Sequence, residues 1–216
     1  IPYLKKAGAT IIVNVCGKSE KDYLEVVERL ADQPVDLLEI NVSCPNVKEG
    51  GIAFGQDPKA LYDITKAVKA KATQPIIMKL SPNVTDITEM AKAAVDAGSD
   101  ALSLINTLTG MKIDIERRDF VLANKTGGMS GPAIKPVAVR MVYQVANAVD
   151  VPIIGMGGIS TAEDALEFIM AGATAVSVGT ANFINPATTL EVVDGIKTYM
   201  ERHQINDINE LIGCVK

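Results

Sequence analysis

Six short apolar runs recur along the chain, separated by longer stretches with helical periodicity. Each run is almost continuously apolar and rich in Val and Ile, which is typical of parallel strands that are covered on both faces. The predicted strands are 10–15, 35–41, 75–80, 100–106, 151–156 and 173–178. Strands that alternate with helices predict a parallel α/β fold, and no long linker or low-complexity segment divides the chain into two domains.

Local signals predict where the intervening helices begin and end. Ala97-Gly98 and Ala171-Gly172 are typical of helix ends that lead into a strand. Two patterns resemble capping boxes, and two others place a capping residue before a proline at the first helical position. These four predicted starts are Ser19 with Asp22, Ser160 with Glu163, Asp57-Pro58 and Asn185-Pro186.

The last two predicted strands distinguish between two α/β architectures. They end in Gly157-Gly158 and Gly179-Thr180, where glycines expose backbone N–H groups that can hold a phosphate. In (β/α)8 barrels a phosphate site is often built from the loops after strands seven and eight. We therefore expect a (β/α)8 TIM barrel rather than an open doubly wound sheet.

The beginning of the chain bears on how much of the barrel is present. It opens Ile1-Pro2-Tyr3, without an initiator Met, and the first predicted strand follows almost at once. We expect residues 1–216 to form a single barrel domain with about six of eight βα units, the first two being absent.

Composition excludes several classes of function. The formal net charge is −5 without a block of Lys or Arg, so a nucleic-acid surface is disfavoured. Three widely spaced cysteines, at 16, 44 and 214, predict neither a disulfide framework nor a metal site and suit a reducing cytoplasm. The longest uncharged stretch, 168–190, is interrupted by Gly, Asn and Pro, so no membrane span is expected.

The loop Asn41-Val-Ser-Cys-Pro-Asn46 is the first candidate site. It follows a predicted strand directly, and it offers a thiol, a hydroxyl and two amides at the carboxyl end of that strand. A buried cysteine that only packs is the ordinary alternative. The polar loop beside Pro45 favours a functional Cys44, whereas Cys16 and Cys214 are predicted to be small packing residues.

Other strand ends carry further polar candidates. Lys79 either extends into solvent or stabilises an electron-rich ring or a reduced anionic cofactor. Asn41, Asn46 and Asn106 either cap turns or recognise a planar, amide-rich ligand.

A glycine-rich segment and the single histidine are the remaining candidates. The segment 127–131 is either a flexible loop or a close backbone approach to a ligand, with Gly131 opening a helix. His203, the sole histidine, is predicted to be a surface residue.

Taken together, these motifs resemble the class 1 dihydroorotate dehydrogenases. The matching segments span the chain in the family's order: Asn41–Asn46, Lys79 behind Ile-Ile-Met, Ile105-Asn106-Thr107, Gly127–Gly131, Gly157-Gly158 and Gly179-Thr180. The continuation through residues 47–55 resembles subclass 1B, which passes electrons to NAD through an iron–sulfur FAD subunit.

The resemblance implies an FMN enzyme that oxidises dihydroorotate to orotate in de novo pyrimidine biosynthesis. Cys44 would be the catalytic base, and Asn41, Asn46, Asn106 and Thr107 would bind the substrate. The remaining family positions would bind FMN: Asn14, Asn41, Lys79, Ile105, Gly131, Gly157, Gly158, Gly179 and Thr180. The resemblance also implies a homodimer within a heterotetramer, in the cytoplasm.

Several alternatives remain open from the sequence. They are another FMN barrel, such as a dihydropyrimidine dehydrogenase or a fumarate-using class 1A enzyme, and a flavin-free phosphate-binding barrel. A subunit or fragment that binds a ligand or a partner without turnover is a further reading.

Overall fold

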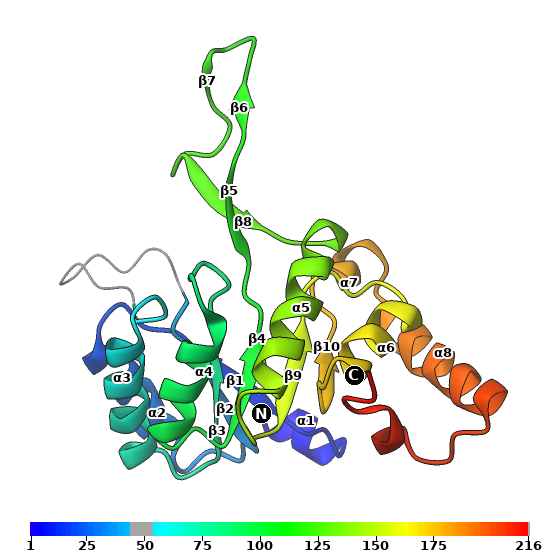
Figure 1. Ribbon diagram of the computed structural model, residues 1–216. Coiled ribbons are helices and arrows are strands. Elements are labelled where there is room, and N and C mark those ends of the chain that lie inside the picture. Colours follow the sequence, from blue (N-terminus) through cyan, green and yellow to red (C-terminus); the bar gives the residue numbers. More distant parts are fainter. Residues whose placement is uncertain (44–53, 216) are drawn as a thin grey trace.

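A six-stranded parallel sheet forms the centre of the computed structural model, which describes residues 1–43 and 54–215 (Figure 1). Its strands follow one another in sequence order, which is the order of a (β/α)8 barrel. They are β1 (Ile12–Val15), β2 (Leu37–Asn41), β3 (Ile76–Lys79), β4 (Ala101–Leu104), β9 (Ile153–Met156) and β10 (Ala175–Ser177). All six predicted strands are confirmed, and the barrel prediction is confirmed as a six-stranded, open part of such a barrel.

Helices precede, connect and follow the strands of this sheet. They are α1 (Pro2–Lys6), α2 (Glu20–Leu30), α3 (Pro58–Lys71), α4 (Ile87–Asp96), α5 (Lys135–Ala146), α6 (Ala162–Met170), α7 (Ala181–Ile184) and α8 (Thr188–His203), with 3-10 turns η1 (Pro132–Ile134) and η2 (Ile208–Leu211). Because the strand order never reverses and parallel crossovers are right-handed, the crossover helices cover one face of the sheet. The capping box of Ser19 with Asp22 and the Asp57 cap are confirmed.

Two predicted helix starts are wrong. The second capping box lies one residue later, at Thr161 and Asp164, because the Asp164 carboxylate accepts hydrogen bonds from the backbone N–H groups of both Ser160 and Thr161. The helix predicted to start at Pro186 begins at Thr188 with Ala187 as its cap. There the Asn185 side chain accepts from the Ala187 N–H and holds Pro186 in a turn.

Strand register separates an apolar face of the sheet from a polar one. Side chains alternate along a strand, so residues paired across strands share a face with those two positions away. Leu38, Ile40, Ile76, Met78 and Leu102 are fully buried in the core on one face. The pairings Asn14 with Glu39, Asn41 with Lys79, and Lys79 with Ser103 place five polar residues on the other face.

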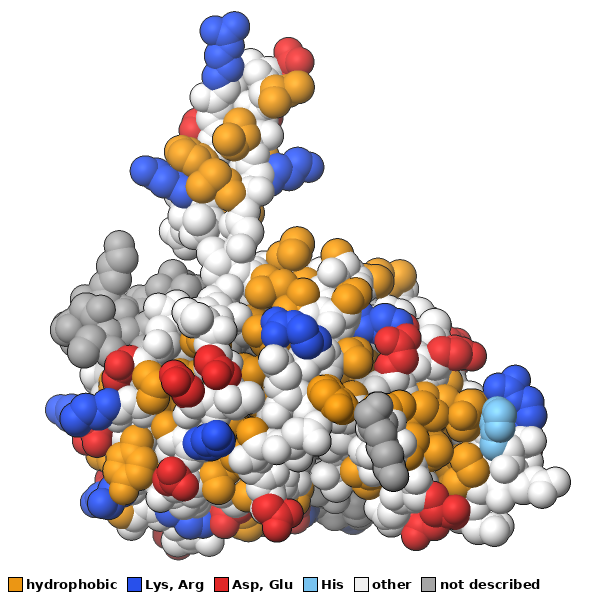
Figure 2. Space-filling view, viewed as in Figure 1, with side chains coloured by type: hydrophobic (Ala, Val, Ile, Leu, Met, Phe, Trp, Pro, Cys, Tyr) orange, Lys and Arg blue, Asp and Glu red, His pale blue; other side chains and the backbone are white. Residues whose placement is uncertain are grey.

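A β-arm, residues 108–129, projects from the sheet between β4 and α5 (Figure 1). It pairs β5 (Leu108–Met111) with β8 (Thr126–Met129) and, at its tip, β6 (Ile113–Asp114) with β7 (Asp119–Phe120). Apolar and basic side chains are exposed along it (Figure 2). The interpretation of segment 127–131 as a flexible loop is therefore wrong: residues 127–129 belong to β8, although Gly131 does open a helical turn as predicted.

Four minor features complete the fold. His203 ends α8 and is exposed as predicted. Cys16 and Cys214 are also exposed, so the prediction that they pack in the interior is wrong. Within the described ranges, no helix combines the length and the apolar composition that crossing a membrane requires.

Replacing Phe168 tests the packing behind β9. Its ring is fully buried and lies where a Cβ on Gly155 would come within 2.7 Å of it, so the pair is closely complementary. Phe168→Ala is expected to lower the free energy of unfolding by about 3–5 kcal/mol through the cavity it leaves. The measurement is denaturant unfolding, with Phe183→Ala as the matched control.

Phe183 is 92% exposed on α7, so its removal is expected to change the free energy of unfolding by less than about 0.5 kcal/mol. Equal losses in the two variants would contradict this account of the core.

Candidate functional site

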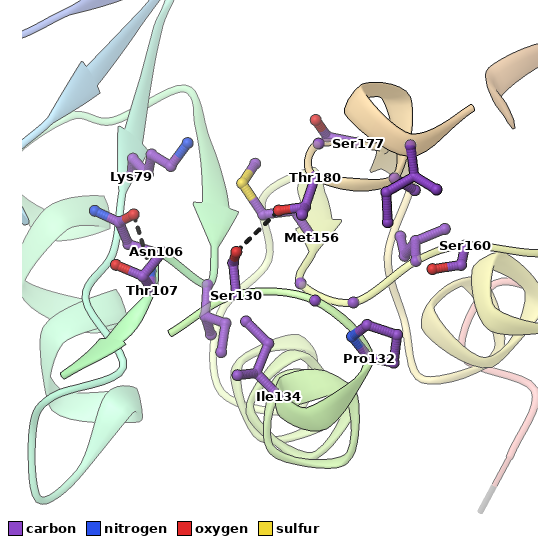
Figure 3. Close-up of a pocket in the computed structure, with 18 residues that line it drawn as sticks. Lys79, Asn106, Thr107, Ser130, Pro132, Ile134, Met156, Ser160, Ser177 and Thr180 are labelled. Carbon is purple, nitrogen blue, oxygen red and sulfur yellow. Dashed lines mark hydrogen bonds between the residues drawn. The ribbon is translucent and has the colours of Figure 1, made fainter. Parts of the chain in front are cut away.

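A cavity of about 240 Å³ opens at the carboxyl ends of β3, β4, β9 and β10 (Figure 3). Its wall contains nine of the residues singled out from the sequence: Lys79, Ile105, Asn106, Thr107, Gly131, Gly157, Gly158, Gly179 and Thr180. Figure 3 shows Lys79, Asn106 and Thr107 on one side and Ser160 and Ser177 on the other, with Met156 between them. Segments from residue 79 to residue 184 thus meet around one space.

Four predicted site residues are not in that wall. Asn14 and Asn41 lie on β1 and β2, on the polar face of the sheet beside the cavity. Cys44 and Asn46 lie outside the residues that the structure describes.

Backbone shape at one end of the cavity requires glycine. Gly157 and Gly158 have φ values of 127° and 83°, a region that other residues rarely adopt. A Cβ on Gly158 would come within 2.8 Å of the Gly131 carbonyl oxygen. At Gly179, by contrast, a Cβ would meet no heavy atom within 4 Å. Backbone N–H groups exposed in such loops are suited to binding a phosphate.

Lys135 fixes the loop that carries Gly158. Its ammonium lies 2.6 Å from Asp164 and 2.5 Å from Glu167, which ties the start of α5 to α6. The hydrogen bonds that the ammonium donates to these two carboxylates raise the pKa of Lys135. Burial opposes ionisation of Asp164, but hydrogen bonds from Lys135 and from the N–H groups of Ser160 and Thr161 lower its pKa overall.

The β-arm is joined to the cavity at two points. The Thr180 hydroxyl donates to the Ser130 hydroxyl at 3.0 Å, so the last loop of the sheet meets the end of the arm (Figure 3). A Cβ on Gly128 would lie 2.2 Å from the Thr107 hydroxyl, so glycine lets β8 pass directly over Thr107. Asn83 fastens the same region, donating to the Thr107 carbonyl and accepting from the Thr109 N–H.

A second polar cluster lies where β2 and β4 end. The Asn41 side-chain oxygen accepts from the Ser43 hydroxyl at 2.8 Å, and the Asn106 amide donates to that hydroxyl. The Asn106 oxygen accepts from the Thr107 N–H at 2.9 Å. These contacts fix the orientation of both amides next to the cavity.

The described residues on either side of 44–53 lie close to the end of β2. The buried Tyr23 hydroxyl donates to the Asn41 carbonyl at 2.8 Å, and the Phe54 ring packs edge-on against the Tyr23 ring. A Cβ on Gly55 would lie 2.8 Å from the Val42 carbonyl oxygen, so the two flanks of the loop meet closely.

Lys79 forms an ion pair that the sequence did not reveal. Its ammonium lies 3.3 Å from Glu39, and both side chains are largely buried. Glu39 was missed because it interrupts an apolar run as a single acidic residue, and its partners are distant in sequence. Asn83, Ser103, Ser130 and Ser177 were missed for the same reason, since an isolated polar residue carries little local signal.

The donor set suits a phosphorylated, planar cofactor such as a flavin nucleotide. One end offers glycine backbone and hydroxyl groups, and the rest offers Ile105, Ile134 and Met156 with one cation, Lys79. Within residues 1–43 and 54–215, no cluster of three or more His, Cys, Asp or Glu could hold a metal ion.

Comparison with known proteins identifies a family. Residues 2–200 match the family model described as dihydroorotate dehydrogenase. The chain is 71% identical over 216 residues, 100% of its length and 72% of the relative's, to a protein of Lachnoclostridium phytofermentans named dihydroorotate dehydrogenase B (NAD(+)), catalytic subunit. It is 57% identical to the protein of the same name from Geotalea uraniireducens, covering 71% of that protein.

A solved structure agrees with the sequence comparison. The chain resembles dihydroorotate dehydrogenase of Eimeria tenella, solved in complex with ferulenol, with a TM-score of 0.77 at 26% identity. The match covers 94% of this chain and 61% of that one.

Asp164→Asn tests the brace behind Gly158. The folded-state pKa of Asp164 is lowered, so its contribution to stability is present above the unfolded value of about 3.9 and is lost as pH falls through the folded value. The variant is therefore expected to melt at a lower temperature than the wild type at pH 7, and this difference is expected to shrink as the pH falls below about 3.9.

Asp194→Asn provides a matched control, because Asp194 pairs with Lys197 in an exposed position that contributes little to stability. Thermal unfolding across this pH range checks both variants. A difference in melting temperature between Asp164→Asn and the wild type that stays constant with pH would contradict the lowered pKa of Asp164.

Proposed function

Because this chain belongs to the dihydroorotate dehydrogenase family, we propose that its protein oxidises dihydroorotate to orotate in de novo pyrimidine (UMP) biosynthesis. The observation that carries the proposal is the convergence of Lys79, Asn106 and Thr107 with the glycine loops at 157–158 and 179–180 around one cavity. A site for a flavin and a pyrimidine ring requires a cation, polar side chains that hydrogen-bond to the ring, and backbone N–H groups that bind the phosphate.

The cofactor is FMN and the final acceptor is NAD. The residues of the cavity fit FMN in chemical type, with glycine N–H groups toward its phosphate and Lys79 toward its ring. Electrons pass to NAD through an iron–sulfur FAD subunit, in line with the relatives' name as catalytic subunits. The chain forms part of a single barrel domain, in a homodimer within a cytoplasmic heterotetramer.

Cys44 is the base in this scheme. Its thiolate removes the proton from C5 of dihydroorotate, so the proton moves to the sulfur while the C5–C6 double bond forms. Hydrogen-bond donors and cations near a thiol can lower its pKa toward neutrality, so a cysteine is suited to this role. When bound, FMN would supply the acceptor for the hydride at C6.

The remaining residues bind and orient the reactants. Asn41, Asn46, Asn106 and Thr107 hold the pyrimidine ring through paired donors and acceptors. Lys79, with Asn14, Ile105 and Gly131, would hold the flavin, where a cation would favour electron-rich ring states. Gly157, Gly158, Gly179 and Thr180 hold the phosphate.

A visible spectrum tests the proposed function. The full-length protein is expected to be yellow as purified, with bound FMN identified by mass spectrometry after release. Adding dihydroorotate without oxygen is expected to bleach the flavin band, whereas dihydrouracil is not. A colourless protein that binds no added FMN would contradict the proposal.

Cys44→Ala tests the base. The variant is expected to retain FMN but to lose dihydroorotate oxidation by at least about 100-fold, because a positioned acid–base group contributes 10²–10⁴-fold. Single-turnover flavin bleaching provides the rate. Cys214→Ala, which removes an exposed thiol elsewhere, is the control. Bleaching by Cys44→Ala at the wild-type rate would rule out the role of Cys44.

A further inference from the structure

Glu39 is a buried acid for which the proposed reaction has no use. It lies in the middle of β2 between Leu38 and Ile40, and its side chain is 12% exposed. A carboxylate buried to this extent is costly unless several groups donate to it. Strand alternation turns it away from its apolar neighbours and toward the polar face of the sheet.

Three other strands supply donors to this carboxylate. Ser103 on β4 donates its hydroxyl to one oxygen at 2.7 Å. Asn14 on β1 donates its amide to the other oxygen at 2.5 Å, and the Lys79 ammonium on β3 lies 3.3 Å from that same oxygen. Glu39 therefore joins four consecutive strands, and two of its donors are residues expected to bind the flavin.

Lys79 keeps hydrogen-bonding capacity while it is paired. An ammonium has three protons to donate, and among the described residues Glu39 is the acceptor found for this one. Lys79 also lines the cavity, so a ligand there can accept from the same nitrogen. The negative charge behind the lysine holds the ammonium in place and offsets part of its field.

The Asn14 amide is oriented by the same acid. Its nitrogen donates to Glu39, which leaves its oxygen to accept from the Cys16 thiol at 3.2 Å. Glu39 thus fixes the orientation of the Asn14 amide, with its nitrogen toward Glu39 and its oxygen toward Cys16. The positions of both Asn14 and Lys79 therefore depend on Glu39.

We propose that Glu39 is a positioning residue of the flavin site: it holds Lys79 and Asn14 at the cavity and moderates the positive charge that Lys79 presents to the ring. The proposal rests on the proposed function for the identity of the ligand. The placement of Lys79 by Glu39 does not depend on which ligand binds.

Glu39→Gln removes the charge and keeps the size. In the apoprotein, acetic anhydride is expected to label Lys79 about fivefold faster in this variant than in the wild type, because the amine is no longer held by an ion pair. Peptide mass spectrometry provides the rate, and circular dichroism verifies the fold. Glu25→Gln is the matched control, since it breaks an exposed pair with Arg29 on α2.

The flavin midpoint potential provides the second measurement. With FMN bound, Glu39→Gln is expected to shift the equilibrium with a reference dye about tenfold toward reduced flavin, which is about 30 mV for two electrons. The unopposed Lys79 charge favours the more negative reduced ring. Glu25→Gln is expected to leave the potential unchanged.

Glu39→Asp distinguishes the effect of the position of the carboxylate from the effect of its charge. It also provides the test if Glu39→Gln does not fold. It keeps the charge but is one methylene shorter, so Lys79 labelling is expected to rise while the potential stays closer to the wild type. Wild-type labelling of Lys79 in both variants would overturn the proposal, and an unchanged potential in Glu39→Gln would overturn its electrostatic part. A wild-type protein that binds no FMN would contradict the proposed function. Faster labelling of Lys79 in Glu39→Gln would in that case still support the placement of Lys79 by Glu39.

Discussion

The alternation of side chains along parallel strands is the constraint on which the rest of the molecule depends. One set of positions, such as Leu38, Ile40 and Met78, packs beneath the helices, and the intervening set faces away from them. A shift of one residue in any strand would exchange the two sets. Because apolar burial dominates folding free energy, the core enforces the register, and the register brings Asn14, Glu39, Lys79 and Ser103 together.

Rigid anchoring then converts this face into a site. The glycines at 157 and 158 let backbone turn sharply at the end of β9, and Lys135 braces that turn from behind through Asp164. The base of the β-arm packs against the other side, where Gly128 lies against Thr107 and Ser130 meets Thr180. The residues proposed to hold a ring and those proposed to hold a phosphate are thereby connected through packed backbone and through side-chain contacts.

Two of the cations described at this edge of the sheet are balanced by buried or partly buried acids. Lys79 faces the cavity with Glu39 behind it, and Lys135 lies beside the glycine loop with Asp164 and Glu167. Such pairs contribute little net stability compared with apolar groups of the same size. Their value lies in holding a charge at a defined point, which is what a site that stabilises a developing negative charge requires.

The sequence by itself determined the six strands, the parallel fold and the family, because apolar periodicity and glycine- or asparagine-containing strand ends are local patterns. It also determined half of the cavity wall, since a residue that follows a strand must lie at the carboxyl edge of the sheet. It did not predict the β-arm, whose short strands of mixed polarity have no clear alternation, or the exposure of Cys16 and Cys214.

Only the tertiary structure decided the partners of Lys79. Glu39 and Ser103 are 64 residues apart, and Glu39 and Lys79 are 40 apart, so no local pattern relates them. Their meeting follows from the pairing of neighbouring strands, and that pairing is set by the packing of the whole core.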